Sequence, residues 1–116
     1  MSKSQEASGT VDTHETGNSW KGTFTVDDVE YLFSATMNPN VSAFTISDAK
    51  LHYNDTEDLT GSSVDYYGTV GKELNVTLEN GVTITGSLEV GTAVYPETNI
   101  VGSGTWNARP AIVSLR

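Results

Sequence analysis

Apolar and polar residues alternate one by one along much of this chain, most clearly between residues 72 and 90. The alternation runs from Leu74 to Leu78, pauses at Asn80-Gly81, and resumes from Val82 to Val90. A period of two gives a β-strand one apolar face and one polar face. Asn and Gly both tolerate a positive φ, so the pattern predicts a β-hairpin with a two-residue type I′ turn.

Similar segments predict further strands on both sides of this hairpin. Asp27-Asp28 is expected to be a turn between two of them. Residues 43–53 change parity, which favours a strand with a bulge near Ser47-Asp48 over a short helix capped by Ser47. The predicted strands cover residues 20–26, 29–37, 43–53, 62–70, 72–79, 82–90, 99–103 and 106–115.

About eight short strands with turn signals between them, and no clear helix, predict an antiparallel sandwich or barrel. Sequential hairpins favour an up-and-down meander, which usually closes because closure removes exposed edges. The first 18 residues are rich in Ser, Thr, Glu and Gly and contain one β-branched aliphatic residue, Val11. We therefore expect an all-β single domain: a closed β-barrel over residues 19–116, preceded by a disordered arm over residues 1–18.

Composition narrows the possible partners. The 116 residues suit one domain, and the lack of cysteine excludes disulfides and zinc–thiolate sites. With 15 acidic and 6 basic residues, the net charge of −9 argues against nucleic acid and anionic membrane surfaces as partners. No apolar run approaches the about 20 residues of a membrane helix, so we expect no membrane insertion. The Thr, Ser, Gly and Asn content favours an exported or surface protein whose signal has been removed, with the cytoplasm as the alternative.

Two segments resemble the calycin-type meander barrels, the lipocalin and avidin group. One places Trp20 at the start of the first expected strand, within Gly-Asn-Ser-Trp-Lys-Gly. The other is the late segment Ile-Val-Gly-Ser-Gly-Thr-Trp-Asn-Ala-Arg, which ends at Arg109. In lipocalins an early tryptophan closes the barrel floor and a late arginine packs across it. The resemblance implies these closing roles for Trp20 and Arg109, with a cation–π contact between them.

The chain offers little catalytic or metal-binding chemistry. We expect His14 to lie in the arm and His52 on the surface. Asp55, Glu57 and Asp58 are weak candidates for a calcium site, because they lack the spacing of a recognised calcium loop and suit a solvated loop. The sequence therefore predicts no catalytic residue, no metal site and no cofactor.

Aromatic residues occur throughout the predicted strands. In a small barrel most inward rings fill the core, and the alternative is a pocket at one mouth in which tyrosine hydroxyls orient a ligand. A proline-containing loop would place Tyr95 at the lip of such a mouth. The candidate ligand-binding residues are Tyr31, Phe33, Tyr66, Tyr95 and Trp106.

Three functional hypotheses follow. The first is a non-enzymatic module that binds a small, partly apolar ligand at one barrel mouth. The second is a structural or interaction subunit of a surface or viral assembly, with a protein partner or a homo-oligomer. The third is a small barrel enzyme, an isomerase or hydrolase, that uses buried carboxylates.

Overall fold

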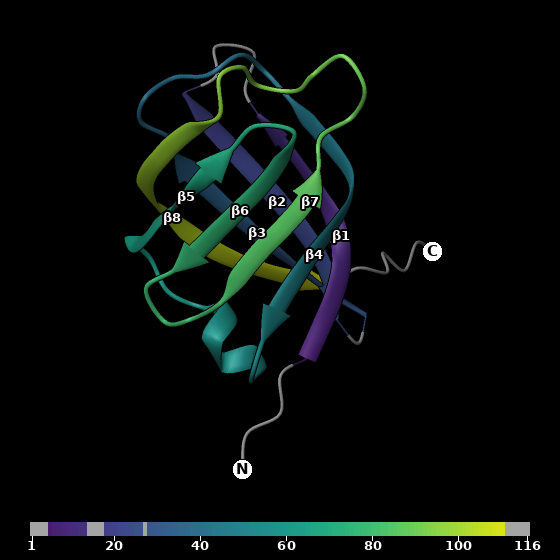
Figure 1. The fold of residues 1–116 in the computed structure, drawn as a ribbon. Helices are drawn as coiled ribbons and strands as arrows, with labels where there is room; N and C mark the ends of the chain where they lie inside the picture. Colours follow the sequence, from purple (N-terminus) through teal and green to yellow (C-terminus); the bar gives the residue numbers. More distant parts are fainter. Residues whose placement is uncertain (1–4, 14–17, 27, 111–116) are drawn as a thin grey trace.

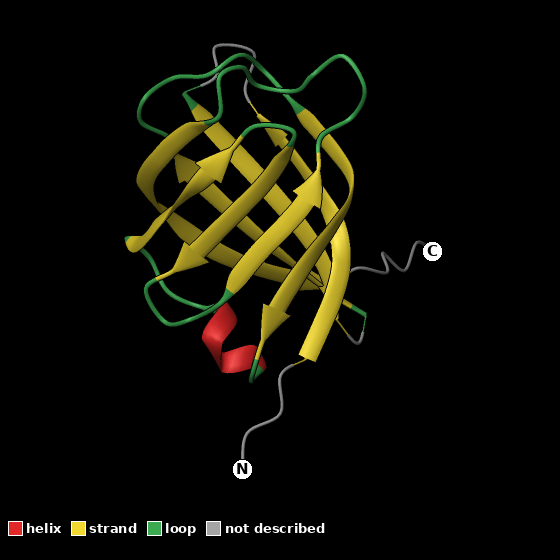
Figure 2. Cartoon of the chain, viewed as in Figure 1, coloured by secondary structure: helices red, strands yellow, loops and turns green. Residues whose placement is uncertain are grey.

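The computed structural model describes residues 5–13, 18–26 and 28–110, which form a closed barrel of antiparallel strands (Figures 1 and 2). Around the barrel the order is β1-β2-β3-β8-β5-β6-β7-β4, and β4 closes the ring against β1. The predicted all-β, eight-stranded antiparallel barrel is confirmed, and it is consistent with the calycin-like class of barrels. The elements are β1 Gln5–Thr13, β2 Ser19–Val26, β3 Val29–Thr36, β4 Thr45–Tyr53, the 3₁₀ helix η1 Thr56–Leu59, β5 Val64–Val70, β6 Glu73–Leu78, β7 Thr83–Ser87 and β8 Thr98–Pro110.

Two three-strand meanders, β1–β3 and β5–β7, make up most of the ring. The strand that follows each meander crosses to the other half, so β4 pairs with β7 and β1, and β8 pairs with β3 and β5. The ring thus departs from one unbroken meander at three connections, 37–44, 54–63 and 88–97, because each joins strands that are not neighbours. The connections 37–44 and 88–97 pass over the upper end of the barrel in Figure 2. They cover it with buried apolar side chains, while η1 places buried Leu59 at the other end.

The two halves share a local sequence at equivalent places. Gly9-Thr10-Val11 lies in β1 and Gly68-Thr69-Val70 in β5. A Cβ at Gly9 would lie 1.8 Å from the Thr23 carbonyl oxygen, and one at Gly68 would lie 2.0 Å from that of Asn75. Both positions therefore require glycine, because the next strand approaches too closely for a side chain.

Strand β1 overturns the predicted disorder of residues 1–18 over its own length, Gln5–Thr13. It pairs with β2 along one edge and with β4 along the other, and it buries Ala7 and Val11. Its composition indicated disorder because the segment buries little of its own surface. Two neighbouring strands supply the hydrogen bonds and the burial that composition does not reveal. The other parts of the predicted arm, residues 1–4 and 14–17, lie outside the described residues.

The predicted bulge in β4 is confirmed. Against β1, the register advances two residues from Gly9 to Val11 but three from Ile46 to Ala49. The extra residue falls at Ser47-Asp48, where both side chains are exposed. The alternative of a short helix is therefore wrong for this segment.

The turn between β6 and β7 is one residue longer than predicted. The Gly81 amide donates to the Leu78 carbonyl (2.9 Å), and the Leu78 amide donates to that of Val82 (2.8 Å). Gly81 has φ +93°, whereas Asn80 does not adopt a positive φ, so the two-residue type I′ turn is wrong. That turn would have set Glu79 opposite Val82. The longer loop sets two buried residues, Leu78 and Val82, opposite each other, so the apolar pattern decides the loop length.

One long strand, β8, replaces the two strands predicted over 99–103 and 106–115, of which residues 111–116 lie outside the described part. Gly102 and Gly104 lie on the inward face of this continuous strand. A Cβ at Gly104 would lie 2.6 Å from the Phe33 ring, and one at Gly102 would lie 2.2 Å from the Thr36 carbonyl oxygen. The strand count stays at eight because β1 compensates for this merger.

A charge placed on each face of β1 tests whether this segment belongs to the barrel. We expect Val11→Asp to lower the free energy of unfolding by about 3 kcal/mol or more, because it buries an unpaired carboxylate. Thr10→Asp adds the same charge at an exposed neighbour and should change stability by less than about 0.5 kcal/mol. Urea denaturation measures both, and equal, small effects would show that this segment does not pack in the barrel.

Candidate functional site

Four aromatic side chains from four strands meet inside the barrel and form an aromatic cluster: Trp20 (β2), Phe33 (β3), Tyr66 (β5) and Trp106 (β8). All four are buried. Trp20 lies 5.5 Å from both Phe33 and Tyr66, measured between ring centroids, and Phe33 lies 4.8 Å from Trp106. The rings are tilted or edge-on, the arrangements that aromatic quadrupoles favour. They fill the interior along β2, β3, β5 and β8.

The Tyr66 hydroxyl links the aromatic cluster to the backbone. It accepts a hydrogen bond from Trp20 Nε1 (2.9 Å) and donates one to the Thr36 carbonyl oxygen (2.5 Å). Burial raises the pKa of Tyr66 to about 12, and the hydrogen bond from Trp20 opposes that rise. The indole and phenol groups of this pair are therefore used within the core.

The Trp106 indole differs from that of Trp20. Its Nε1 is buried and finds no acceptor among the described residues. The ring is held instead by its contact with Phe33, which is its register partner on β3. An unpaired buried donor costs about 1–3 kcal/mol, so ring packing has to outweigh that loss at this position.

The five predicted ligand-binding residues do not form one pocket. Phe33, Tyr66 and Trp106 meet in the aromatic cluster, where they pack as core. Tyr31 is half-buried and pairs with Ala108, near the end of β8. Tyr95 is 73% exposed on the connection that precedes the start of β8, at the opposite end of that strand. The sequence could not show that Tyr31 and Tyr95 lie near opposite ends of β8, because this depends on the path of the connection that precedes β8.

The predicted contact between Trp20 and Arg109 is wrong. Arg109 Nε lies 2.8 Å from Glu30 Oε1 on the outer surface, and its side chain is 64% exposed. Strand alternation explains the outcome: in β8 Gly104 and Trp106 are buried, which turns the odd-numbered Arg109 outward. Trp20 does lie in the core, but its polar partner is Tyr66.

The acidic loop before β5 serves as a helix cap. Asp55 Oδ1 accepts from the Glu57 amide (3.1 Å), and Asp58 Oδ2 accepts from the Asp55 amide (3.3 Å). This reciprocal capping box satisfies the free amides at the start of η1. Over the described residues, no group of three or more His, Cys, Asp or Glu side chains is placed to hold a metal ion.

One candidate site is a hollow in the outer wall, not a barrel mouth. This outer hollow has a volume of about 590 Å³ and lies across β1, β2, β3 and β8. The sequence did not indicate it because most of its lining side chains are ordinary outward Ser, Thr, Asp and Lys residues of their strands, while Trp20, Ala35 and Gly104 are buried. Its lining residues are Asp12, Thr13, Ser19, Trp20, Lys21, Ser34, Ala35, Thr36, Ser63, Ser103, Gly104 and Thr105.

Small outward side chains on adjacent strands create the outer hollow. Ser34 pairs with Thr105 across β3 and β8, and Thr36 Oγ1 donates to the Ser103 carbonyl oxygen (3.3 Å). None of these side chains is long enough to fill the surface of the twisted sheet. Asp12 and Lys21 are register partners on β1 and β2 and bring one charge of each sign to the hollow. The site therefore combines hydroxyl groups, methyl groups and a balanced pair of charges.

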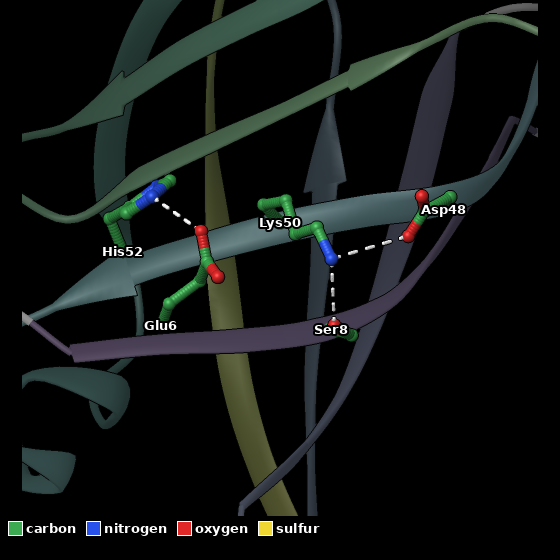
Figure 3. Close-up of polar contacts among 5 residues, drawn as sticks. All are labelled: Glu6, Ser8, Asp48, Lys50 and His52. Carbon is green, nitrogen blue, oxygen red and sulfur yellow. Dashed lines mark hydrogen bonds and ion pairs between the residues drawn. The ribbon is translucent and has the colours of Figure 1, made fainter.

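A different wall of the barrel carries a row of polar contacts between β1 and β4 (Figure 3). His52 Nε2 lies 3.0 Å from Glu6 Oε2, while Lys50 Nζ lies 3.4 Å from Asp48 Oδ1 and 3.1 Å from Ser8 Oγ. These side chains point outward and are partly exposed, so the expected surface position of His52 is confirmed. His14 lies outside the described residues.

Comparisons with protein-family models, with curated proteins and with solved structures give no match to this chain. In the described part of the chain, no helix is long and apolar enough to cross a membrane. The candidate site is therefore argued from its geometry alone.

Removing the Tyr66 hydroxyl should destabilise the barrel. We expect Tyr66→Phe to lower the free energy of unfolding by about 1–3 kcal/mol, because it leaves the Trp20 donor and the Thr36 carbonyl unpaired. Tyr67→Phe makes the same change at the exposed neighbouring residue and should cost less than about 0.5 kcal/mol. Equal losses in urea denaturation would contradict a special role for the buried hydroxyl.

Tyr66 should also make the barrel weaker at high pH. The folded chain holds the Tyr66 proton up to about pH 12, whereas the unfolded chain loses it near the ordinary tyrosine pKa of 10.0. The contribution of the Tyr66 proton to the free energy of unfolding is therefore complete below pH 10 and is lost as the pH rises towards 12. We expect the free energy of unfolding to fall less steeply over this interval in Tyr66→Phe than in Tyr67→Phe. Parallel curves for the two variants would contradict the raised pKa.

Proposed function

We propose that this protein is a non-enzymatic binding module that holds a small, partly apolar ligand in the outer hollow. The observation that carries the proposal is the hollow itself, whose volume of about 590 Å³ is that of a small-molecule site. Such sites typically measure about 300–1,000 Å³ and combine an apolar lining with a few placed polar groups. The likeness to calycin-type barrels, many of which bind small ligands, supports the proposal at the level of the barrel class.

The lining indicates the chemistry of the ligand. Ser34, Thr36 and Thr105 offer hydroxyl groups beside their own methyl or methylene groups. Trp20 and Ala35 also line the hollow, but both are buried and belong to the core, so they offer little surface to a ligand. Asp12 and Lys21 contribute opposite charges, which favours a ligand without net charge. A neutral molecule with several hydroxyl groups and one apolar face, such as a pyranose ring, fits this description.

The enzyme hypothesis has less support. It required buried carboxylates whose pKa could be shifted by their surroundings. None of the Asp and Glu side chains among the described residues is buried. The outer hollow contains a single carboxylate, Asp12, so carboxylate-pair chemistry has no second member there.

Blocking the outer hollow tests the proposal. The probes are a panel of methyl glycosides and small aromatic alcohols, followed by amide chemical shifts in NMR and by tryptophan fluorescence. We expect at least one probe to shift the amides of Ser34, Thr36 and Thr105. Thr105→Phe fills the hollow and should weaken that binding about tenfold or more, equivalent to about 1.4 kcal/mol.

Thr25→Phe is the matched control, since Thr25 is also an exposed strand threonine but does not line the hollow. It should leave binding unchanged. If no probe shifts these amides, or if Thr105→Phe binds as well as the unaltered protein, the outer hollow is not the site. Shifts confined to Tyr31 and Ala108 would instead favour a site at the barrel mouth.

A further inference from the structure

An exposed aromatic–aliphatic pair lies on the outer face of β5 and β8. Tyr67 and Val101 are register partners on these strands, and they are 62% and 50% exposed. The outward neighbours of this pair on the same strands, Asp65, Thr69 and Ser103, are polar. Tyr67 and Val101 therefore form a small apolar island on a hydrophilic wall, which we call the Tyr67 face.

Two carboxylates flank the Tyr67 face on one side. Asp65 precedes Tyr67 by two residues on β5, so both point outward about 7 Å apart. The Glu79 amide donates to the Asp65 carbonyl oxygen (2.9 Å), which places Glu79 just beyond the end of β6 and beside Asp65. One long side chain lying on the Tyr67 ring could therefore reach both carboxylates.

As far as the structure describes the chain, the carboxylates of the Tyr67 face have no cation beside them to balance their charge. The ion pairs of the described residues are Asp48–Lys50 and Glu6–His52, which Figure 3 shows, and Glu30–Arg109. They lie on β1, β3, β4 and β8. Within the part of the chain that the structure describes, neither Asp65 nor Glu79 has such a partner. Because the whole chain carries a net charge of −9, the Tyr67 face presents an uncompensated negative potential.

We propose that the Tyr67 face docks an arginine-bearing segment of another protein. A guanidinium stacks on a tyrosine ring and pairs with carboxylates in the same plane, while its alkyl stem packs on an aliphatic neighbour such as Val101. Lysine provides the charge but not the planar stacking, so arginine is the better fit. A second copy of this chain is a poor occupant, because it brings the same negative charge to the contact.

A labelled oligo-arginine peptide tests the proposal by fluorescence anisotropy at near-physiological salt. We expect it to bind the full chain more tightly than an oligo-lysine peptide of equal length. Tyr67→Ser, and separately the double variant Asp65→Asn with Glu79→Gln, should each weaken binding by about tenfold, since each removes one part of the recognition. All three positions are exposed, and thermal unfolding checks that the variants remain folded.

Matched controls separate recognition from general attraction to an acidic protein. Tyr95→Ser alters another exposed tyrosine, and Glu57→Gln with Glu89→Gln removes the same charge at other exposed sites. Both should leave the peptide affinity within about twofold of the unaltered chain. The proposal is overturned if the control double variant weakens binding as much as Asp65→Asn with Glu79→Gln, or if the peptide does not bind. Self-association that depends on Tyr67, seen by sedimentation, would assign the face to a second copy instead. None of these outcomes depends on the outer hollow, so the two proposals fail separately.

Discussion

The packing of four aromatic rings against inward glycines is the constraint on which this barrel depends. Gly22 pairs with Phe33 across β2 and β3, and Gly102 pairs with Tyr66 across β8 and β5. A Cβ at Gly22 would lie 2.9 Å from the Phe24 ring on its own strand, and one at Gly102 would lie 3.0 Å from the Tyr66 ring on β5. A Cβ at Gly104 would lie 2.6 Å from the Phe33 ring on β3, so each glycine leaves space that an aromatic ring occupies. A large buried side chain contributes about 1.5–3 kcal/mol, so the four rings supply much of the burial in a domain of this size. Gly102 and Gly104 therefore allow β8 to pass the Tyr66 and Phe33 rings as one continuous strand.

Ring closure explains why a strand that buries few large side chains remains in the barrel. Strand β1 has few large side chains, but it lies between β2 and β4 and completes the ring. Strands β4 and β8 each pair with one strand of either half, so the two halves are joined at two places around the ring. A closed ring leaves no free strand edge among its members, so backbone pairing is not available for recognition. Recognition must then depend on outward side chains.

The two proposed surfaces follow from this division between inside and outside. Because the aromatic rings occupy the interior, the proposed ligand site lies on the outer wall, where small serine and threonine side chains line the hollow. Strand β8 contributes to both surfaces: Ser103 and Thr105 line the outer hollow, and Val101 belongs to the Tyr67 face. The long strand that the inward glycines permit thus also arranges the outer wall.

Alternation along the chain determined the local structure. It identified the hairpin around Asn80-Gly81, the bulge at Ser47-Asp48 and the all-β class, because the burial of alternate side chains is a local property of each strand. The same alternation agrees with the longer loop, because that loop sets buried Leu78 opposite buried Val82. The turn residues Asn80-Gly81, taken alone, predicted a two-residue turn.

Only the tertiary structure decided which strands are neighbours, and the rest follows from that. It placed Gln5–Thr13 in the barrel, turned Arg109 to Glu30, separated Tyr31 from Tyr95, and assembled the outer hollow from four strands. Each of these features joins residues far apart in sequence. Their contact depends on ring closure and strand order, which a periodic pattern repeated in every strand does not encode.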